Sequence, residues 1–172
     1  MKNISILFIA LLVFAACKPS KQKMLMGKWQ AVSMSSPQLE QEIADTKAFM
    51  DTVGKSTTPD ENELLYGVRN MDSMRIFMKE QLNETLLHQE QLIQNTSLDF
   101  YSKTEVASNF GSGQDTIGWY IDDDGALILD EMKKKGAGSK ITMEIAQLDQ
   151  DSLQLRFNEN GYSSTATFIR KK

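Results

Sequence analysis

The sequence predicts a mainly β fold, an eight-stranded antiparallel barrel or strongly curved sheet with a helical insertion after its first strand. Two observations lead to this prediction. From residue 97 to residue 170, apolar and polar side chains alternate with a period of two in seven short segments, which is typical of half-buried strands. One further segment of this kind lies at residues 25–32, and the 36–95 section between it and the others has the longer period of amphipathic helices.

Each of the expected strands has one apolar face and is followed by turn residues. The clusters Asp122–Gly125 and Asn158–Gly161 are rich in aspartate, asparagine and glycine, which favour hairpin turns. An up-and-down barrel accommodates such strands with few exposed edges, and a two-sheet sandwich is the main alternative. The strands are expected at residues 25–32, 98–101, 105–110, 117–121, 127–129, 141–145, 153–157 and 164–170.

The 36–95 section contains two helix-start signals. The dipeptide Ser36–Pro37 is typical of a helix N-terminus, with a hydroxyl at the cap and proline at the first helical position. The Thr-Pro-Asp-Glu sequence at 58–61 combines a capping box, a proline and acidic residues in the first turn. Because Gly67 and Asn70 can interrupt the second helix, we expect two or three helices in this section.

The N-terminus has the layout of a secretion signal. Lys2 precedes an apolar run that ends at Ala15, Ala16 and Cys17. This run is shorter than the roughly 20 apolar residues of a membrane-spanning helix. The small residues directly before the cysteine resemble the lipobox of bacterial lipoproteins, in which the cysteine carries the acyl chains. We therefore expect a signal peptide at 1–16, a lipidated tether at 17–23 and a single domain at 24–172.

Charge and cysteine content limit the partners and bonds of the protein. The chain has 19 basic and 23 acidic residues, for a formal net charge of −4, so nucleic acid is not an expected partner. Cys17 is the only cysteine, so no disulfide can form within the chain. The expected contact with a membrane is through the lipid anchor on Cys17.

Few residues could support catalysis or metal binding. His88 is the only histidine, which leaves no zinc-ligand set, and no serine lies in a Gly-x-Ser-x-Gly elbow. The Asp122–Gly125 cluster lacks the alternating carboxylates and the final glutamate of a calcium loop, so we interpret it as a charged hairpin turn. We interpret Lys133–Lys135 as a solvated loop. The sequence therefore predicts no enzyme activity, no metal and no cofactor.

Two motifs resemble those of a known family. Gly-Lys-Trp at 27–29 and Phe-Ile-Arg at 168–170 are similar to the first and last strands of the lipocalin-like lipoproteins of Bacteroidetes-type bacteria. The resemblance covers the first strand and residues 96–172, and the helical insertion departs from it. It implies that an arginine packs across a tryptophan at the closed end of the barrel, which assigns a structural role to Gly27, Trp29 and Arg170.

The interior of the barrel is the remaining candidate site, because a barrel of about eight strands can hold one small ligand. A cavity is expected between the aromatic residues Phe110, Trp119 and Phe157. The inward positions that can leave space beside them are Ala31, Ser108, Ser164 and Ala166. The insertion is expected to cover part of the mouth, where flexible methionines adapt to varied ligands. The methionines expected at the mouth are Met71, Met74 and Met78. A core filled by side chains is the alternative.

These observations favour a non-catalytic, membrane-anchored binding protein for a small apolar or amphipathic ligand. The alternative is an interaction module whose helical insertion docks on another protein of the cell envelope. The lipoprotein resemblance implies an exported protein. Lys18 and Pro19 replace the aspartate that retains lipoproteins in the inner membrane, so an outer-membrane position is expected.

Overall fold

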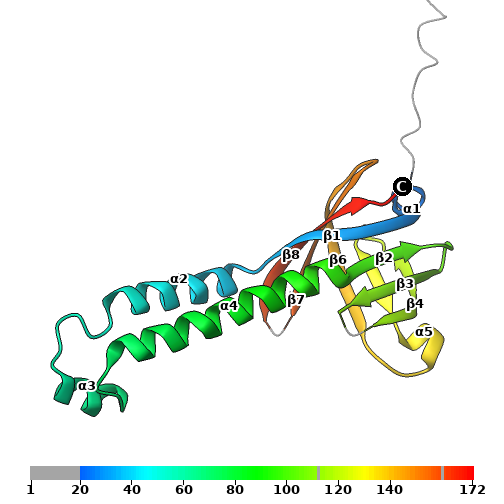
Figure 1. Ribbon diagram of the computed structural model, residues 1–172. Helices are drawn as coiled ribbons and strands as arrows, with labels where there is room; N and C mark the ends of the chain where they lie inside the picture. Colours follow the sequence, from blue (N-terminus) through cyan, green and yellow to red (C-terminus); the bar gives the residue numbers. More distant parts are fainter. Residues whose placement is uncertain (1–19, 112, 160) are drawn as a thin grey trace, which may run out of the picture.

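The computed structural model describes residues 20–111, 113–159 and 161–172, and its eight strands form a closed antiparallel barrel (Figure 1). Each strand pairs with its neighbours in the chain, and β1 pairs with β8 to close the barrel. The predicted eight-stranded antiparallel barrel is therefore confirmed, and the two-sheet sandwich is excluded. The strands are β1 (Gly27–Ser35), β2 (Thr96–Phe100), β3 (Glu105–Phe110), β4 (Gln114–Ile121), β5 (Leu127–Asp130), β6 (Lys140–Leu148), β7 (Ser152–Glu159) and β8 (Tyr162–Arg170).

Every second side chain of a strand faces the inside of the barrel, as the alternation in the sequence predicted. In β1, Trp29 and Ala31 are buried, but a register shift follows, after which Met34 is the partly buried residue. Such a bulge adds one residue to one strand and so changes which positions face inward. A similar shift occurs in β6, between Ile145 and Gln147.

The helices lie outside the barrel, and three of them follow β1 in the chain. None of the helices in the described part of the chain is long and apolar enough to cross a bilayer. They are α1 (Lys21–Leu25), α2 (Pro37–Thr52), α3 (Pro59–Tyr66), α4 (Met71–Asn95) and α5 (Met132–Lys135).

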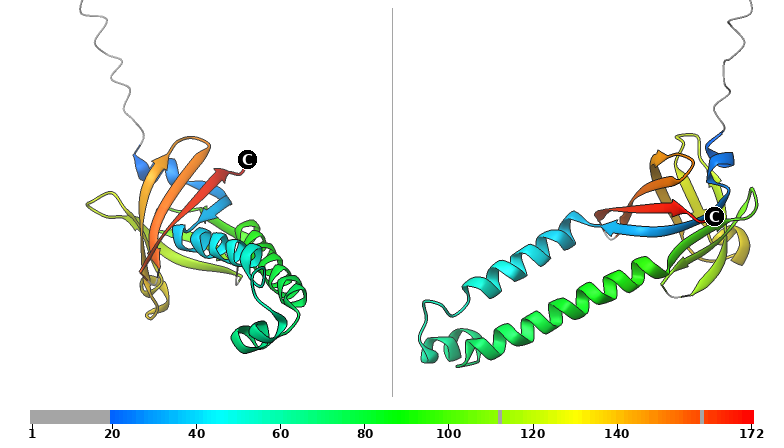
Figure 2. Two further views of the ribbon diagram at one scale, coloured as in Figure 1. Left: turned by 90° about the vertical axis from the view of Figure 1, so that its left-hand side faces the viewer. Right: turned by 45° about the horizontal axis from the view of Figure 1, so that its top comes forward.

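Helices α2 and α4 run side by side away from the barrel, and α3 lies at their far end (Figures 1 and 2). We refer to residues 37–95 as the helical arm. Its base is attached where α4 runs into β2: the Gln30 side chain donates hydrogen bonds of 2.8 Å to the carbonyl oxygens of Gln94 and Thr96. The insertion was expected to cover part of the mouth of the barrel, and the base of the arm is the part that reaches it.

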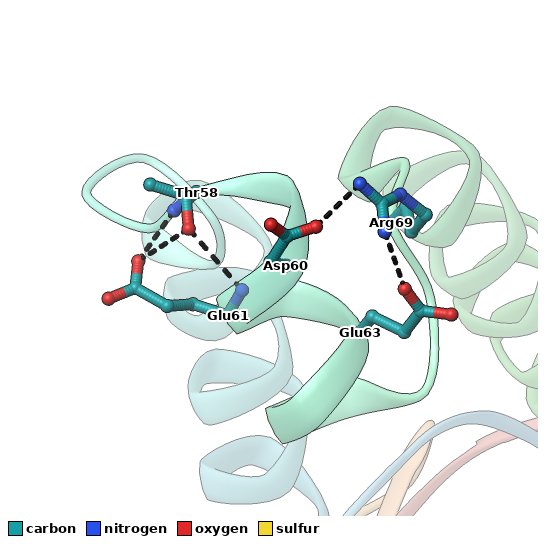
Figure 3. Close-up of polar contacts among 5 residues, drawn as sticks. All are labelled: Thr58, Asp60, Glu61, Glu63 and Arg69. Carbon is teal, nitrogen blue, oxygen red and sulfur yellow. Dashed lines mark hydrogen bonds and ion pairs between the residues drawn. The ribbon is translucent and has the colours of Figure 1, made fainter.

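Local side-chain contacts set the ends of the arm helices. At the start of α3, the Thr58 hydroxyl accepts a hydrogen bond from the backbone N–H of Glu61, and the Glu61 carboxylate accepts one from the N–H of Thr58 (Figure 3). The backbone hydrogen bond from Thr58 lowers the pKa of Glu61. After α3, Arg69 forms ion pairs of 2.6 Å with Asp60 and 2.7 Å with Glu63 (Figure 3). The capping box predicted from the sequence is thus confirmed.

Helix α1 covers the end of the barrel opposite the arm (Figure 1). Its last residue, Leu25, is fully buried, and the carbonyl oxygen of Leu25 accepts a 2.7 Å hydrogen bond from the indole Nε1 of Trp29. Residues 21–23, which were expected to belong to the tether, are instead part of this helix. The expected first strand also begins two residues later, at Gly27, because Leu25 reaches the core from a helix.

Arg170 joins α1, the first strand and the last strand at this closed end. Its guanidinium carbon lies 4.1 Å from the centre of the Trp29 ring, which confirms the expected contact. Its two terminal nitrogens donate hydrogen bonds of 2.6 Å to the carbonyl oxygens of Met24 and Met26. Gly27 has a φ of +114°, and a Cβ there would lie 2.8 Å from Arg170 Nη1, so a side chain at this position would displace the guanidinium.

We expect Arg170→Met to lower the free energy of unfolding by about 2–4 kcal/mol, because charged hydrogen bonds and the cation–π contact are lost together. Urea denaturation measures the change. Arg156→Met is the matched control, since Arg156 is an exposed strand residue whose ion pair with Glu144 spans 3.4 Å. Equal losses of stability in the two variants would contradict the closing role of Arg170.

Candidate functional site

A cavity of about 1160 Å³ opens at the end of the barrel from which the arm leaves. It is surrounded by residues near the ends of β1, β3 and β7 and near the starts of β2, β6 and β8. The base of the arm completes the wall through Leu39 of α2 and through Leu92 and Ile93 of α4. The cavity is therefore built jointly by the barrel and the arm.

The deep wall of this cavity is apolar. It is made by alternate residues of three neighbouring strands, whose side chains face the interior. Met143, Leu155, Ala166 and Phe168 are at most 3% exposed, so the bottom of the cavity rests on the packed core. Hydroxyl and amide groups lie among the other lining residues, which include Ser139, Ser163, Ser164, Thr96, Gln89 and Asn158.

Lys140, Glu144 and Arg156 of the cavity wall all form ion pairs. Lys140 Nζ lies 3.2 Å from the carboxylate of Asp130, and Arg156 Nη1 lies 3.4 Å from that of Glu144. Burial acts to raise the pKa of Asp130, but the hydrogen bonds from Lys140 and from the Lys133 backbone outweigh it and lower that pKa. The hydrogen bond between the Lys140 side chain and Asp130 raises the pKa of Lys140. These pairs leave the wall without a surplus of either charge.

Of the three aromatic residues expected in the cavity, the structure places two there. Phe110 and Phe157 line it, and Phe110 is 38% exposed at the mouth. Trp119 is fully buried in the other half of the barrel, where it packs edge-on against Phe100 with ring centroids 4.8 Å apart. Its indole Nε1 donates a 3.0 Å hydrogen bond to the carbonyl oxygen of Ser102. The expectation for Trp119 is wrong because period-two alternation identifies the inward face of a strand but not the depth of a residue along the barrel.

The methionine stripe of α4 does not face the mouth. Met71, Met74 and Met78 lie in the first two turns of α4, at the tip of the arm. Met71 is 5% exposed and packs against Gly54, where an added Cβ would come within 2.4 Å of its Cγ. At 1.5 Å per helical residue, Met78 lies roughly 21 Å along the helix from Leu92, which does line the cavity.

The small inward residues divide between three environments. Ser164 and Ala166 line the cavity, whereas Ser108 borders a separate hollow of about 110 Å³. Ala31 is 4% exposed and belongs to the packed core. The half of the barrel at α1 is thus filled, and the half at the arm is open.

Several lining residues were not expected from the sequence, among them Met34, Met143, Leu155 and the arm residues Leu39, Leu92 and Ile93. The strand residues follow the inward alternation and lie near the open end of their strands, so strand pairing combined with the alternation could have found them. No pattern in the sequence places the base of the arm beside them.

The other residues singled out from the sequence lie apart from the cavity. His88 is an exposed residue of α4, and Asp122 accepts a 2.8 Å hydrogen bond from the N–H of Ala126 in the turn between β4 and β5. That hairpin turn was predicted. Within the described ranges, no three histidine, cysteine or carboxylate residues are grouped as a metal site. Cys17 and the expected leader lie outside the described residues.

Comparison of the chain with protein-family models, with curated proteins and with solved structures finds no match. The resemblance to lipocalin-like lipoproteins therefore stays a prediction from two short motifs.

Proposed function

We propose that this protein is a membrane-anchored, lipocalin-like binding protein that holds a small apolar or amphipathic molecule in the open half of its barrel. The observation that carries the proposal is the cavity of about 1160 Å³ between the barrel and the base of the arm. Small-molecule sites commonly have volumes of about 300–1,000 Å³ and mostly apolar walls with a few polar groups. The volume here exceeds this range because the cavity is open to solvent.

The chemistry of the wall favours a ligand with an apolar body. Met143, Leu155 and Phe168 form a buried apolar floor. Covering such a floor with a ligand removes apolar surface from water, which contributes about 25 cal/mol for each Å². Hydroxyl and amide groups nearer the mouth suit a polar head. Since Lys140 and Arg156 already have carboxylate partners, the wall offers no unpaired cation to select an acid.

The proposal is one of binding without catalysis. The cavity-lining residues of the described chain include neither histidine nor cysteine, the side chains that most often act as general base or as nucleophile. A site of this composition can bury and orient a molecule. The proposal of a membrane anchor is based on the sequence around Cys17. Such an anchor would hold the protein in the cell envelope, and we propose the outer membrane as its location.

A cavity-filling substitution tests the proposal. Ser164 lines the cavity and Thr165, the next residue of β8, points to the opposite face of the strand. We expect the fluorescent probe N-phenyl-1-naphthylamine to bind the full chain at micromolar concentration. Ser164→Phe should raise its Kd at least about tenfold, equivalent to ~1.4 kcal/mol.

Thr165→Phe is the matched control, because it adds the same side chain to the same strand outside the cavity. We expect its Kd for the probe to equal that of the unmodified chain. The proposal fails if the unmodified chain binds no apolar probe at micromolar concentration, or if both variants bind it equally well.

A further inference from the structure

The negative charge of the protein is concentrated in the helical arm. Residues 37–95 contain 11 acidic and 5 basic side chains, a net charge of −6, whereas the whole chain has a net charge of −4. The remainder of the chain is therefore weakly basic. Among the basic side chains of the arm, Arg69 and Arg75 are already paired with acids of the arm itself. At least six carboxylates of the arm consequently have no arm cation to neutralise them.

The tip of the arm also exposes large apolar side chains. Leu64 is 85% exposed, and Leu65, Ile76 and Phe77 are each 61% exposed. We call these four residues the apolar tip. They lie in α3 and in the first two turns of α4, at the far end of the arm from the barrel (Figure 2). Several large apolar side chains exposed at one end of a helical arm commonly mark an interaction surface.

The arm has little core of its own. None of the α2 residues, all of which the structure describes, is fully buried, and in α4, likewise described throughout, Met71 is the only buried residue. Helices in proteins obtain most of their stability from packing an apolar face against other elements. Two helices in contact along one seam leave their outer faces available to a further helix.

The outer face of α4 combines both features in one stripe. Ile76, Glu80, Glu84 and Leu87 follow one another at spacings of four, four and three residues, which places them on the same side of a helix. Leu87 is 59% exposed, like Ile76 at the other end of the stripe. Two carboxylates thus lie between two exposed aliphatic side chains over three turns of helix.

We propose that the apolar tip and this stripe of α4 form a docking surface for a basic amphipathic helix of another protein. Aliphatic side chains of the partner would cover the apolar tip and Leu87. Its lysines or arginines would pair with Glu80 and Glu84. Complementary charge speeds such association and excludes wrong partners. A second copy of this chain would bring another arm of charge −6 to the same place, and an anionic lipid surface would be repelled in the same way.

The test uses the full chain and a fluorescein-labelled amphipathic peptide of leucine and lysine, with a scrambled peptide of the same composition as the comparison. Fluorescence anisotropy measures the Kd. We expect the amphipathic peptide to bind at least about tenfold more tightly than the scrambled one, and to bind less tightly as salt is added. Two variants change the surface, and each should bind the amphipathic peptide at least tenfold less tightly. The first is the triple substitution Leu64→Ser, Ile76→Ser and Phe77→Ser. The second is the double substitution Glu80→Gln and Glu84→Gln.

The control variant, Val32→Ser with Ile169→Ser, removes apolar residues that are 47% and 44% exposed on the barrel. We expect it to bind the peptide as the unmodified chain does, and circular dichroism checks that each variant is folded. Unchanged binding by the two arm variants, or equal binding of the scrambled peptide, overturns the proposal. If light scattering shows a dimer that the arm variants abolish, the occupant is a second copy of this chain and the proposal is overturned. If the unmodified chain binds anionic phosphatidylglycerol vesicles and the arm variants do not, the occupant is lipid and the proposal is likewise overturned. Ser164→Phe should not change peptide binding, so this result is independent of the cavity.

Discussion

Replacing Trp29 by alanine is expected to lower the free energy of unfolding by about 3–5 kcal/mol, which is typical of truncating a buried aromatic side chain. Trp29 is 1% exposed in the core at the closed end of the barrel. The substitution removes the ring on which Arg170 stacks and the indole donor that binds the Leu25 carbonyl oxygen. It therefore opens a cavity and loosens α1 in the same step.

Thermal and urea denaturation measure this loss. For a domain of this size, each kcal/mol corresponds to about 2–4 °C, so the melting temperature should fall by roughly 6–20 °C. Tyr162→Ala is the control, because Tyr162 is 49% exposed at the start of β8 and its loss should change stability little. A fall in unfolding free energy below about 1 kcal/mol for Trp29→Ala would show that the closed end does not stabilise the barrel in this way.

Replacing Cys17 by serine is expected to abolish acylation and to leave the leader uncleaved by the lipoprotein signal peptidase. The expectation rests on the apolar run that ends at Ala15, Ala16 and Cys17. A lipoprotein pathway attaches lipid to the sulfur atom of the cysteine thiol. The hydroxyl group of a serine does not replace that thiol in the reaction. Since each buried CH₂ of an acyl chain contributes about 0.8 kcal/mol, several chains on one residue hold a protein firmly to a bilayer.

Labelling cells with a radioactive fatty acid, followed by gel electrophoresis to compare the label and the size of the chain, tests this expectation. The Cys17→Ser chain should carry no label and keep its leader uncleaved by the lipoprotein signal peptidase. Ser20→Ala is the control, because it removes only the side chain that accepts a hydrogen bond at the start of α1. A Cys17→Ser protein that is still acylated and bound to the membrane would falsify the lipoprotein assignment.

The strands, the arm helices and the capping of α3 could be predicted from the sequence, because each depends on residues close together in the chain. Alternation of apolar residues requires a strand with one buried face, and the seven segments after residue 97 show it. The Thr58–Glu61 capping box is likewise a contact over three residues. The contact between Trp29 and Arg170 joins the first and last strands, and it was expected from a family resemblance and not from local pattern.

The limits of the cavity could not be predicted in this way. Trp119 and Phe157 both face inward by alternation, yet one is in the filled half of the barrel and the other lines the cavity. Their depths depend on the register between neighbouring strands and on the bulges in β1 and β6. Those features arise from contacts between distant segments.

By itself, the sequence determined that the protein has eight strands with one apolar face and helices with defined starts between the first two of them. Only the tertiary structure decided that α1 covers one end of the barrel, that the arm projects from the other, and that the cavity lies between the arm base and the last three strands. The reason is physical: periodicity and capping are local, short-range properties. Burial depth and open volume depend on how segments far apart in the chain pack against one another.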